Sequence, residues 1–141
     1  MPPKILIVVD HGPMRHALRE WLETVFPGCR VVEATSGKEA IAKVEAGSPH
    51  VVVLDTGFPA MNYLGTVTHL RAVVPATPIV VLTNYEPEVH SVLATANGAT
   101  ACVSMDRITE LQPTLAGLLY ARMNWLDTDR VGGDNLTVIT G

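Results

Sequence analysis

Apolar and polar positions along this chain alternate between two repeating patterns. Short apolar runs of strand length are followed by stretches in which apolar residues recur every three or four positions, the spacing of an amphipathic helix. Strands and helices that alternate in this way are typical of βαβ units with parallel strands. The apolar runs predict strands at residues 4–9, 29–34, 50–54, 79–82 and 100–104.

Capping and turn residues mark the ends of the predicted helices. Ser36, with Glu39 three residues further on, forms a capping-box pattern, and Asn97-Gly98 is a left-handed C-terminal signal. Pro113 fits a helix only in its first turn, which leaves the start of the last helix open by several residues. The helical spacing predicts helices at residues 14–25, 36–44, 64–74, 89–96 and 108–123.

Three of the apolar runs end on a side chain that carries oxygen. These side chains are Asp10, Asp55 and Thr83. Because the carboxyl ends of parallel strands meet at the edge of the sheet where α/β folds bind ligands, we expect two carboxylates and a hydroxyl to share one pocket. The last run ends on Met105, where a cation would have completed a phosphate site.

Composition excludes several classes of protein. The 141 residues favour a single domain, and the net charge of -4 with no cluster of Lys or Arg argues against direct nucleic-acid binding. The run from Ile5 to Val9 is too short for a membrane span, so we expect a cytoplasmic protein with no membrane contact. Cys29 and Cys102 lack metal-ligand spacing, which favours free thiols in a reducing compartment.

Five sequence segments resemble the receiver domain of bacterial two-component response regulators, in the order and at the spacing of that family. The resemblance covers nearly all of residues 3–124 and implies a flavodoxin-like, doubly wound α/β fold with a parallel sheet of order 2-1-3-4-5 and five helices. We expect a receiver domain at residues 1–125 and a polar C-terminal tail at 126–141 that forms a short strand or a packing arm. The segments are KILIVVDHGPMRHALREWLE, TSGKEAIA, VVVLDTGFPAMNYL, TPIVVLT and NGAT.

The resemblance also implies a chemistry. Asp55 would be the phosphoacceptor, a nucleophilic carboxylate that takes a phosphoryl group from a histidine kinase or a phosphotransfer protein. Asp10, Asp55 and the backbone carbonyl of Gly57 would bind Mg²⁺. Thr83 would donate a hydrogen bond to the phosphoryl group and move inward as the switch. The only catalysis implied is self-phosphorylation and autodephosphorylation at Asp55, which is not the activity of a metabolic enzyme.

Two departures from the family pattern bear on that chemistry. Val9 stands where a second acidic residue is usual, so we expect weakened magnesium affinity. Met105 replaces the lysine that pairs with the phosphoryl group, and a charge pair at about 4 Å contributes ~4 kcal/mol before desolvation at an effective dielectric constant of about 20. Arg107 is the nearest substitute. These departures keep a second hypothesis open, a pseudo-receiver that acts as a protein-interaction module without phosphorylation.

Smaller departures affect access to the pocket and the output of the signal. Asn84 replaces a small residue beside the phosphate entrance, and Cys102 replaces an aromatic side chain that commonly rotates in the family. Tyr63 replaces a glycine, so the turn before it must be rearranged. Two alternatives apply at the first strand end: Asp10 as a helix N-cap, and His11 as a metal ligand or proton-sensitive neighbour instead of a solvated loop residue.

Partners and competing folds complete the expectations. The resemblance implies a separate effector protein and suggests a homodimer through the fourth and fifth helices. A haloacid-dehalogenase-like phosphatase would need an aspartate at Gly57, and a flavodoxin would need a phosphate loop where Asp10 stands. Residues 130–141 resemble a late strand motif of metal-dependent serine/threonine phosphatases, in which Asp134 would be a metal ligand, but nothing else of that catalytic domain is present.

Overall fold

The computed structural model describes residues 2–57, 63–84 and 87–131. Strands and helices alternate along the chain as the sequence predicts, and a 3₁₀ turn precedes the last helix. The elements are β1 (Lys4–Val8), α1 (Gly12–Val25), β2 (Arg30–Ala34), α2 (Gly37–Ala46), β3 (Val51–Asp55), α3 (Tyr63–Val73), β4 (Ile79–Thr83), α4 (Pro87–Ala96), β5 (Ala101–Ser104), η1 (Met105–Glu110) and α5 (Leu111–Val131).

The strands form one parallel sheet in the order β2-β1-β3-β4-β5. This order confirms the predicted flavodoxin-like fold. Every residue of β3 and β4 is buried, as expected for strands that helices cover on both faces. The register pairs Asp55 with Leu82 and Thr83 with Ser104, so that the carboxyl ends of three strands lie at one edge of the sheet.

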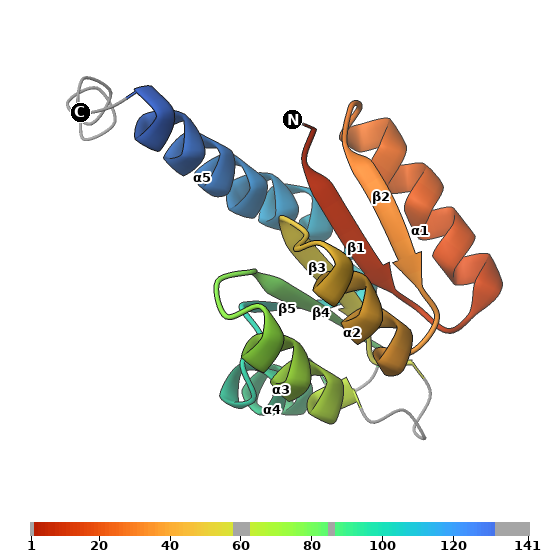
Figure 1. Ribbon diagram of the computed structural model, residues 1–141. Coiled ribbons are helices and arrows are strands. Elements are labelled where there is room, and N and C mark those ends of the chain that lie inside the picture. The colour runs from red at the N-terminus through yellow and green to blue at the C-terminus, as the bar shows by residue number, and fades with distance from the viewer. Residues whose placement is uncertain (1, 58–62, 85–86, 132–141) are drawn as a thin grey trace.

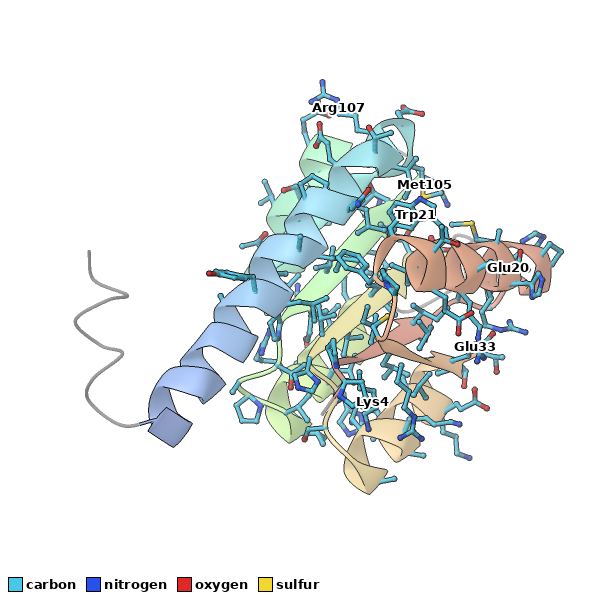
Figure 2. The ribbon with its side chains drawn as sticks, turned by 90° about the horizontal axis from the view of Figure 1, so that it is seen from above. Lys4, Glu20, Trp21, Glu33, Met105 and Arg107 are labelled. Carbon is cyan, nitrogen blue, oxygen red and sulfur yellow. The ribbon has the colours of Figure 1, made fainter. Side chains whose placement is uncertain are left out.

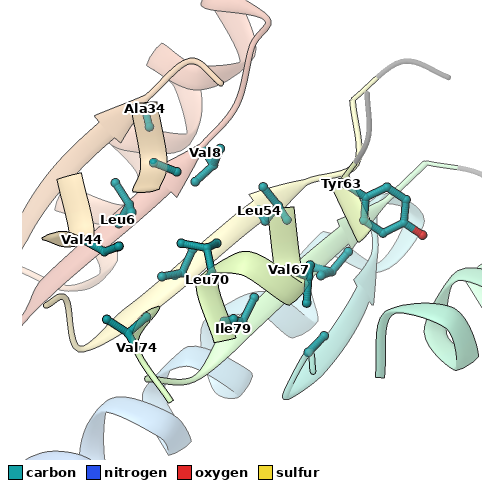
Figure 3. Close-up of a cluster of buried hydrophobic side chains, with 14 of the residues drawn as sticks. Leu6, Val8, Ala34, Val44, Leu54, Tyr63, Val67, Leu70, Val74 and Ile79 are labelled. Carbon is teal, nitrogen blue, oxygen red and sulfur yellow. The ribbon is translucent and has the colours of Figure 1, made fainter. Parts of the chain in front are cut away.

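Helices cover both faces of the sheet (Figure 1). One apolar cluster joins α1 and α5 to one face through Leu22, Leu111 and Leu115. The other cluster joins α2, α3 and α4 to the opposite face, and Figure 3 shows side chains of this cluster, among them Leu6, Leu54 and Leu70. Each fully buried leucine contributes about 1.5–3 kcal/mol to folding, so these clusters fix how the strand ends are placed.

The predicted helix signals are confirmed. Ser36 Oγ accepts a hydrogen bond from the Glu39 N–H at 3.1 Å, and Glu39 in turn accepts one from the Thr35 N–H at 2.7 Å. Gly98 has φ of +115°, a left-handed conformation that a side chain would strain. Pro113 lies in the first turn of α5 because η1 takes up the six residues before that helix.

The structure also differs from the sequence expectations at some boundaries. β3 and β4 extend one residue further than their apolar runs, so Asp55 and Thr83 are the last residues of their strands. α5 continues to Val131, past the position at which a polar tail was expected. Residues 132–141, with Asp134, lie outside the described residues, and so the predicted strand or arm there stays a prediction.

Two further features concern the cysteines and the length of the helices. Cys29 and Cys102 are both free thiols, as predicted. Within the described ranges, no helix has the length and apolar character needed to cross a membrane.

Candidate functional site

The carboxyl ends of the strands surround a pocket of about 140 Å³. The sequence-predicted residues Asp10, Asp55 and Gly57 all line it, so the sheet brings together the groups expected to bind metal. Thr83 is fully buried at the neighbouring end of β4. The remaining lining residues are His11, Met14, Asn84 and Met105.

Asp55 is the most unusual group in this pocket. Asp55 is only 6% exposed, and its Oδ1 has no hydrogen-bond partner among the described residues. Burial raises the pKa of Asp55, the Gly57 amide opposes that rise, and the nearby Asp10 carboxylate raises the pKa further. A buried carboxylate oxygen without a hydrogen-bond partner costs free energy unless a ligand binds it, so Oδ1 is a candidate ligand-binding atom.

Asp10 and Gly57 complete the acidic side of the pocket. Asp10 is exposed, and it is not the N-cap of α1: that role belongs to His11, whose Nδ1 accepts a hydrogen bond from the Met14 N–H at 3.2 Å. The alternative of Asp10 as a cap is therefore wrong, and its carboxylate is left for the pocket. Gly57 has φ of +68°, which turns the chain sharply after β3 and favours a residue without Cβ.

These residues fit a magnesium ion. Mg²⁺ keeps several waters and binds through one or two carboxylates with other oxygen ligands, and the pocket offers two carboxylates and the Gly57 backbone. The unpartnered Asp55 Oδ1 supplies a free oxygen. No group of three His, Cys, Asp or Glu side chains suited to holding a metal occurs in the described part of the chain.

Arg15 anchors the loop that carries Asp10. Its Nη1 donates to the Val9 carbonyl at 3.1 Å, and its Nε pairs with Glu33 Oε1 at 3.0 Å on β2. Arg19 donates to the other carboxylate oxygen of Glu33. Sequence reasoning missed this support. The available signal was that Arg15 and Arg19 lie one turn apart on the helix that follows the Asp10 strand.

Thr83 lies beside Cys102 on β5. Thr83 Oγ1 is buried without a hydrogen-bond partner among the described residues. Burial raises the pKa of the Cys102 thiol, and the neighbouring Thr83 hydroxyl opposes the rise. The hydroxyl is therefore held near a weak thiol partner and is available to a stronger acceptor.

The sequence also did not predict a contact between Tyr63 and His90, which lies near Cys102. Tyr63 is buried at the start of α3, and its hydroxyl shares a short hydrogen bond with His90 Nδ1 on α4. The two rings lie 5.5 Å apart at a tilt of 54°. Burial raises the pKa of Tyr63, and Cys102 adds to that rise. The aromatic ring of Tyr63, from α3, thus lies close to Cys102, the β5 position at which the sequence lacks the expected aromatic residue.

No described side chain supplies the missing cation. Met105 lines the pocket where the family has lysine. Arg107 points away from it, with its side chain 75% exposed and 3.8 Å from Glu110 (Figure 2). Lys4 donates to the Gly47 carbonyl at 2.9 Å, far from the pocket, at the amino end of β1. Arg107, the nearest candidate in the sequence, therefore does not replace the lysine, and the carboxylates face an apolar Met105.

The fold and the pocket define a class of protein, a doubly wound parallel α/β domain with an acidic site at the carboxyl edge of its sheet. Residues 5–111 match the response regulator receiver domain. The chain belongs to the family of response regulator receiver domains, which confirms the resemblance seen in the sequence.

Individual relatives agree with this assignment. The chain is 34% identical over 98 residues to an uncharacterized transcriptional regulatory protein, YhcZ, of Bacillus subtilis, covering 70% of this chain and 46% of that protein. It is also 34% identical over 95 residues to the nitrate/nitrite response regulator NarL of Escherichia coli, covering 65% of this chain and 44% of NarL. The chain therefore spans about half the length of these relatives.

Solved structures show the same fold. A LuxR-family two-component response regulator from Aurantimonas superposes with a TM-score of 0.77 at 26% identity, over 86% of this chain and 87% of the other. The chemotaxis response regulator CheY4 of Vibrio cholerae superposes with a TM-score of 0.71 at 28% identity, over 84% of this chain and all (100%) of the other.

Proposed function

We propose that this receiver domain accepts a phosphoryl group on Asp55 from a histidine kinase or a phosphotransfer protein. The observation that carries the proposal is Asp55 itself, buried at the end of β3 with one carboxylate oxygen unpartnered in an open pocket. A nucleophile needs such an oxygen within reach of its substrate.

In the proposed transfer, one bond to phosphorus forms and one breaks. An oxygen of Asp55 forms a bond to phosphorus while the bond between phosphorus and the donor's imidazole nitrogen breaks, and the electron pair returns to the imidazole. The Thr56 and Gly57 amides favour the charged carboxylate, because both act to lower the pKa of Asp55. Thr83, with its free hydroxyl, donates to a phosphoryl oxygen and moves toward it.

Asp10, Asp55 and the Gly57 carbonyl are the proposed ligands of Mg²⁺, which when bound neutralises charge on the carboxylates and on the incoming phosphoryl group. Val9 is 1% exposed and packs in the apolar core, so it offers no acidic second ligand. We therefore expect weaker magnesium affinity than in a receiver with paired acidic residues.

The output proposed for the phosphorylated form is a change of the surface made by α4, β5 and α5. Large apolar side chains are exposed there: Val92 is 71% exposed on α4, and Tyr120 is 71% exposed on α5. This surface is proposed to bind an effector protein and to form a homodimer. We propose a cytoplasmic protein with no direct nucleic-acid or membrane contact. Its receiver domain was expected at residues 1–125 with a tail at 126–141, and α5 carries the helix on to Val131.

A second candidate is a phosphorylation-independent pseudo-receiver. Met105 favours it, because no described cation stands ready to pair with a phosphoryl group in the pocket. In that case the same surface would bind its partner without any change at Asp55.

Mass spectrometry separates the two candidates. After incubation with acetyl phosphate and Mg²⁺, a competent receiver gains one phosphoryl group, and the gain disappears in Asp55→Asn and when EDTA replaces Mg²⁺. The same reaction with a panel of phosphorylated histidine kinases tests whether the chain accepts a phosphoryl group from a protein donor but not from a small one. No adduct under any of these conditions would establish the pseudo-receiver instead.

A further inference from the structure

A groove of about 550 Å³ runs along the outer edge of β2, the outermost strand on the side of α1 (Figure 1). Four consecutive strand residues, Arg30 to Glu33, line it. Because the side chains of a strand alternate between its two faces, a cavity that touches all four residues lies along the edge. α1 forms one wall with Arg19 and Glu23, and α2 forms the other with Lys43. We refer to this cavity as the β2 groove.

The edge of β2 carries backbone groups that could bond a further strand. The Arg30 N–H donates to the Pro3 carbonyl at 2.8 Å, so Arg30 faces β1. In a parallel ladder the residues of a strand face one neighbour alternately, and Val31 and Glu33 therefore direct their N–H and C=O groups away from β1. No other described strand pairs with β2, so these groups have no ladder partner.

The walls of the β2 groove also leave positive charge over. Both carboxylates of the groove already pair with arginines of α1. Arg30 and Lys43 are exposed, and neither has an ion-pair partner among the described residues. By the alternation of the strand, Arg30 points to the same face as Val32, which packs in the cluster that contains α2, so both cations border the α2 side. This basic edge stands out in a chain whose net charge is -4.

We propose that the β2 groove binds an extended acidic segment of a partner protein, which adds a strand to the sheet beside β2. The backbone of the segment bonds the outward groups of Val31 and Glu33, and its carboxylates, at alternate positions on one face, contact Arg30 and Lys43. The five residues of β2 span about 17 Å, so a segment of about five to seven residues matches the groove. The open ladder makes a peptide the matching anion, because only a peptide supplies alternating N–H and C=O groups.

The β2 groove is separate from the sites of the proposed function. β2 and β5 lie at opposite edges of the sheet, so the groove shares no strand with the surface made by α4, β5 and α5. None of the residues that line the groove lines the pocket of Asp55. Binding at β2 is therefore expected in a receiver and in a pseudo-receiver, and peptide binding and phosphoryl incorporation can each fail without the other.

Amide hydrogen exchange tests whether a strand is added. The full ¹⁵N-labelled chain, unphosphorylated and in EDTA, is titrated with a heptapeptide in which Glu alternates with Val. At saturation we expect the amide hydrogens of Val31 and Glu33 to exchange at least about tenfold more slowly, because they become hydrogen-bonded, while the Arg30 amide, already bonded to Pro3, changes little. Slow exchange at Val31 and Glu33 before peptide is added would mean that the tail or a second copy of the chain covers the edge, and would overturn the proposal.

Two control peptides separate the backbone from the charge. The first has Gln in place of every Glu, and the second keeps Glu but has all its internal amides N-methylated, so it cannot donate to β2. Each is expected to bind at least about tenfold more weakly than the parent peptide. Equal affinity of the N-methylated peptide would mean that no strand is added, and equal affinity of the Gln peptide would mean that the groove does not select acidic segments. Either result contradicts the proposal.

Two charge reversals on α2 form a matched pair of variants. Lys43→Glu removes a cation of the β2 groove, and Lys38→Glu makes the same change on the same helix, at an exposed residue that lines a different cavity. At low salt we expect Lys43→Glu to weaken binding of the parent peptide by at least about tenfold and Lys38→Glu by less than about twofold. Arg30→Glu should act as Lys43→Glu does. With melting curves that show an intact fold, equal losses in Lys38→Glu and Lys43→Glu would reduce the attraction to overall charge and refute the groove as the binding site.

Discussion

Glu33 and Asp55 are carboxylates on strands of the same sheet, and their surroundings are opposite. Glu33 lies on the edge strand β2 between Arg15 and Arg19, and its hydrogen bond with Arg19 is the main cause that lowers the pKa of Glu33. Asp55 ends the central strand β3, no Lys or Arg of the described residues lines its pocket, and burial raises the pKa of Asp55.

The comparison shows that no described arginine pairs with Asp55 in the pocket, although Arg15 lies close by. Arg15 reaches the carbonyl of Val9 in the loop after β1, and its guanidinium fixes that loop to Glu33. A cation placed in the pocket itself would stabilise the fold but would also occupy the site. The edge carboxylate therefore supports structure, whereas the central carboxylate is kept free for binding.

The largest change is expected from giving Asp55 the partner that Glu33 already has. In Met105→Lys, the ammonium reaches the pocket, so the pKa of Asp55 falls from above to below its ordinary value. We also expect phosphoryl incorporation from acetyl phosphate to rise about tenfold, since roughly 1–2 kcal/mol of charge pairing survives desolvation. NMR titration of the Asp55 carboxyl and mass spectrometry measure the two effects.

Met105→Leu is the matched control for that variant. It keeps an apolar side chain of similar size and is expected to leave both the pKa of Asp55 and the rate of phosphorylation unchanged. If the leucine variant gains as much as the lysine variant, the effect comes from altered access to the pocket and not from charge.

A smaller effect is expected from removing the unpaired charge. Asp55→Asn should raise the free energy of unfolding by about 1 kcal/mol at neutral pH, because it removes a buried charge that no described cation pairs with. The raised pKa gives the sign of the pH dependence: the cost of Asp55 is absent below its unfolded pKa of about 3.9 and develops as the pH rises through its folded pKa.

Urea denaturation of both proteins across the acidic range checks this. The stability gap between Asp55→Asn and the parent protein is expected to close as the pH falls. A gap that is constant with pH would attribute the gain to packing. A destabilised Asp55→Asn would mean that the hydrogen bonds from the Thr56 and Gly57 amides to the charged carboxylate outweigh the cost of its burial.

The fold and the acidic side of the site were predictable from sequence because each depends on local pattern. The apolar runs at β3 and β4 determine that both strands are buried, and Asp55 and Thr83 follow from where those runs end. The Ser36 cap and the Gly98 turn are likewise set by a few neighbouring residues. Parallel strands then bring their ends together without further information.

Contacts between distant elements were not predictable in the same way. The Tyr63 and His90 pair joins residues from α3 and α4, and neither position has a spacing signal that indicates the other. Trp21 and Met105, which line one cavity, read singly as packing residues, and only the approach of η1 to α1 makes them one surface. Side-chain pairing across elements depends on tertiary geometry, which periodicity does not encode.

The smallest effect is expected at the edge carboxylate. Glu33→Gln should lower the free energy of unfolding by about 0.5 kcal/mol at neutral pH, because its ion pairs with Arg15 and Arg19 are partly exposed and screened. Here the pKa is lowered by folding, so the stabilisation is present above the unfolded pKa of about 4.3 and is lost as the pH falls through the folded pKa. The parent and the Gln variant should therefore converge at low pH, as the parent and Asp55→Asn do, but from the opposite side.

Urea denaturation at low and high salt measures the loss, which high salt should reduce. A loss that salt leaves unchanged would mean that Glu33 acts through its uncharged hydrogen-bond geometry, and the contrast with Asp55 would then not be one of charge pairing.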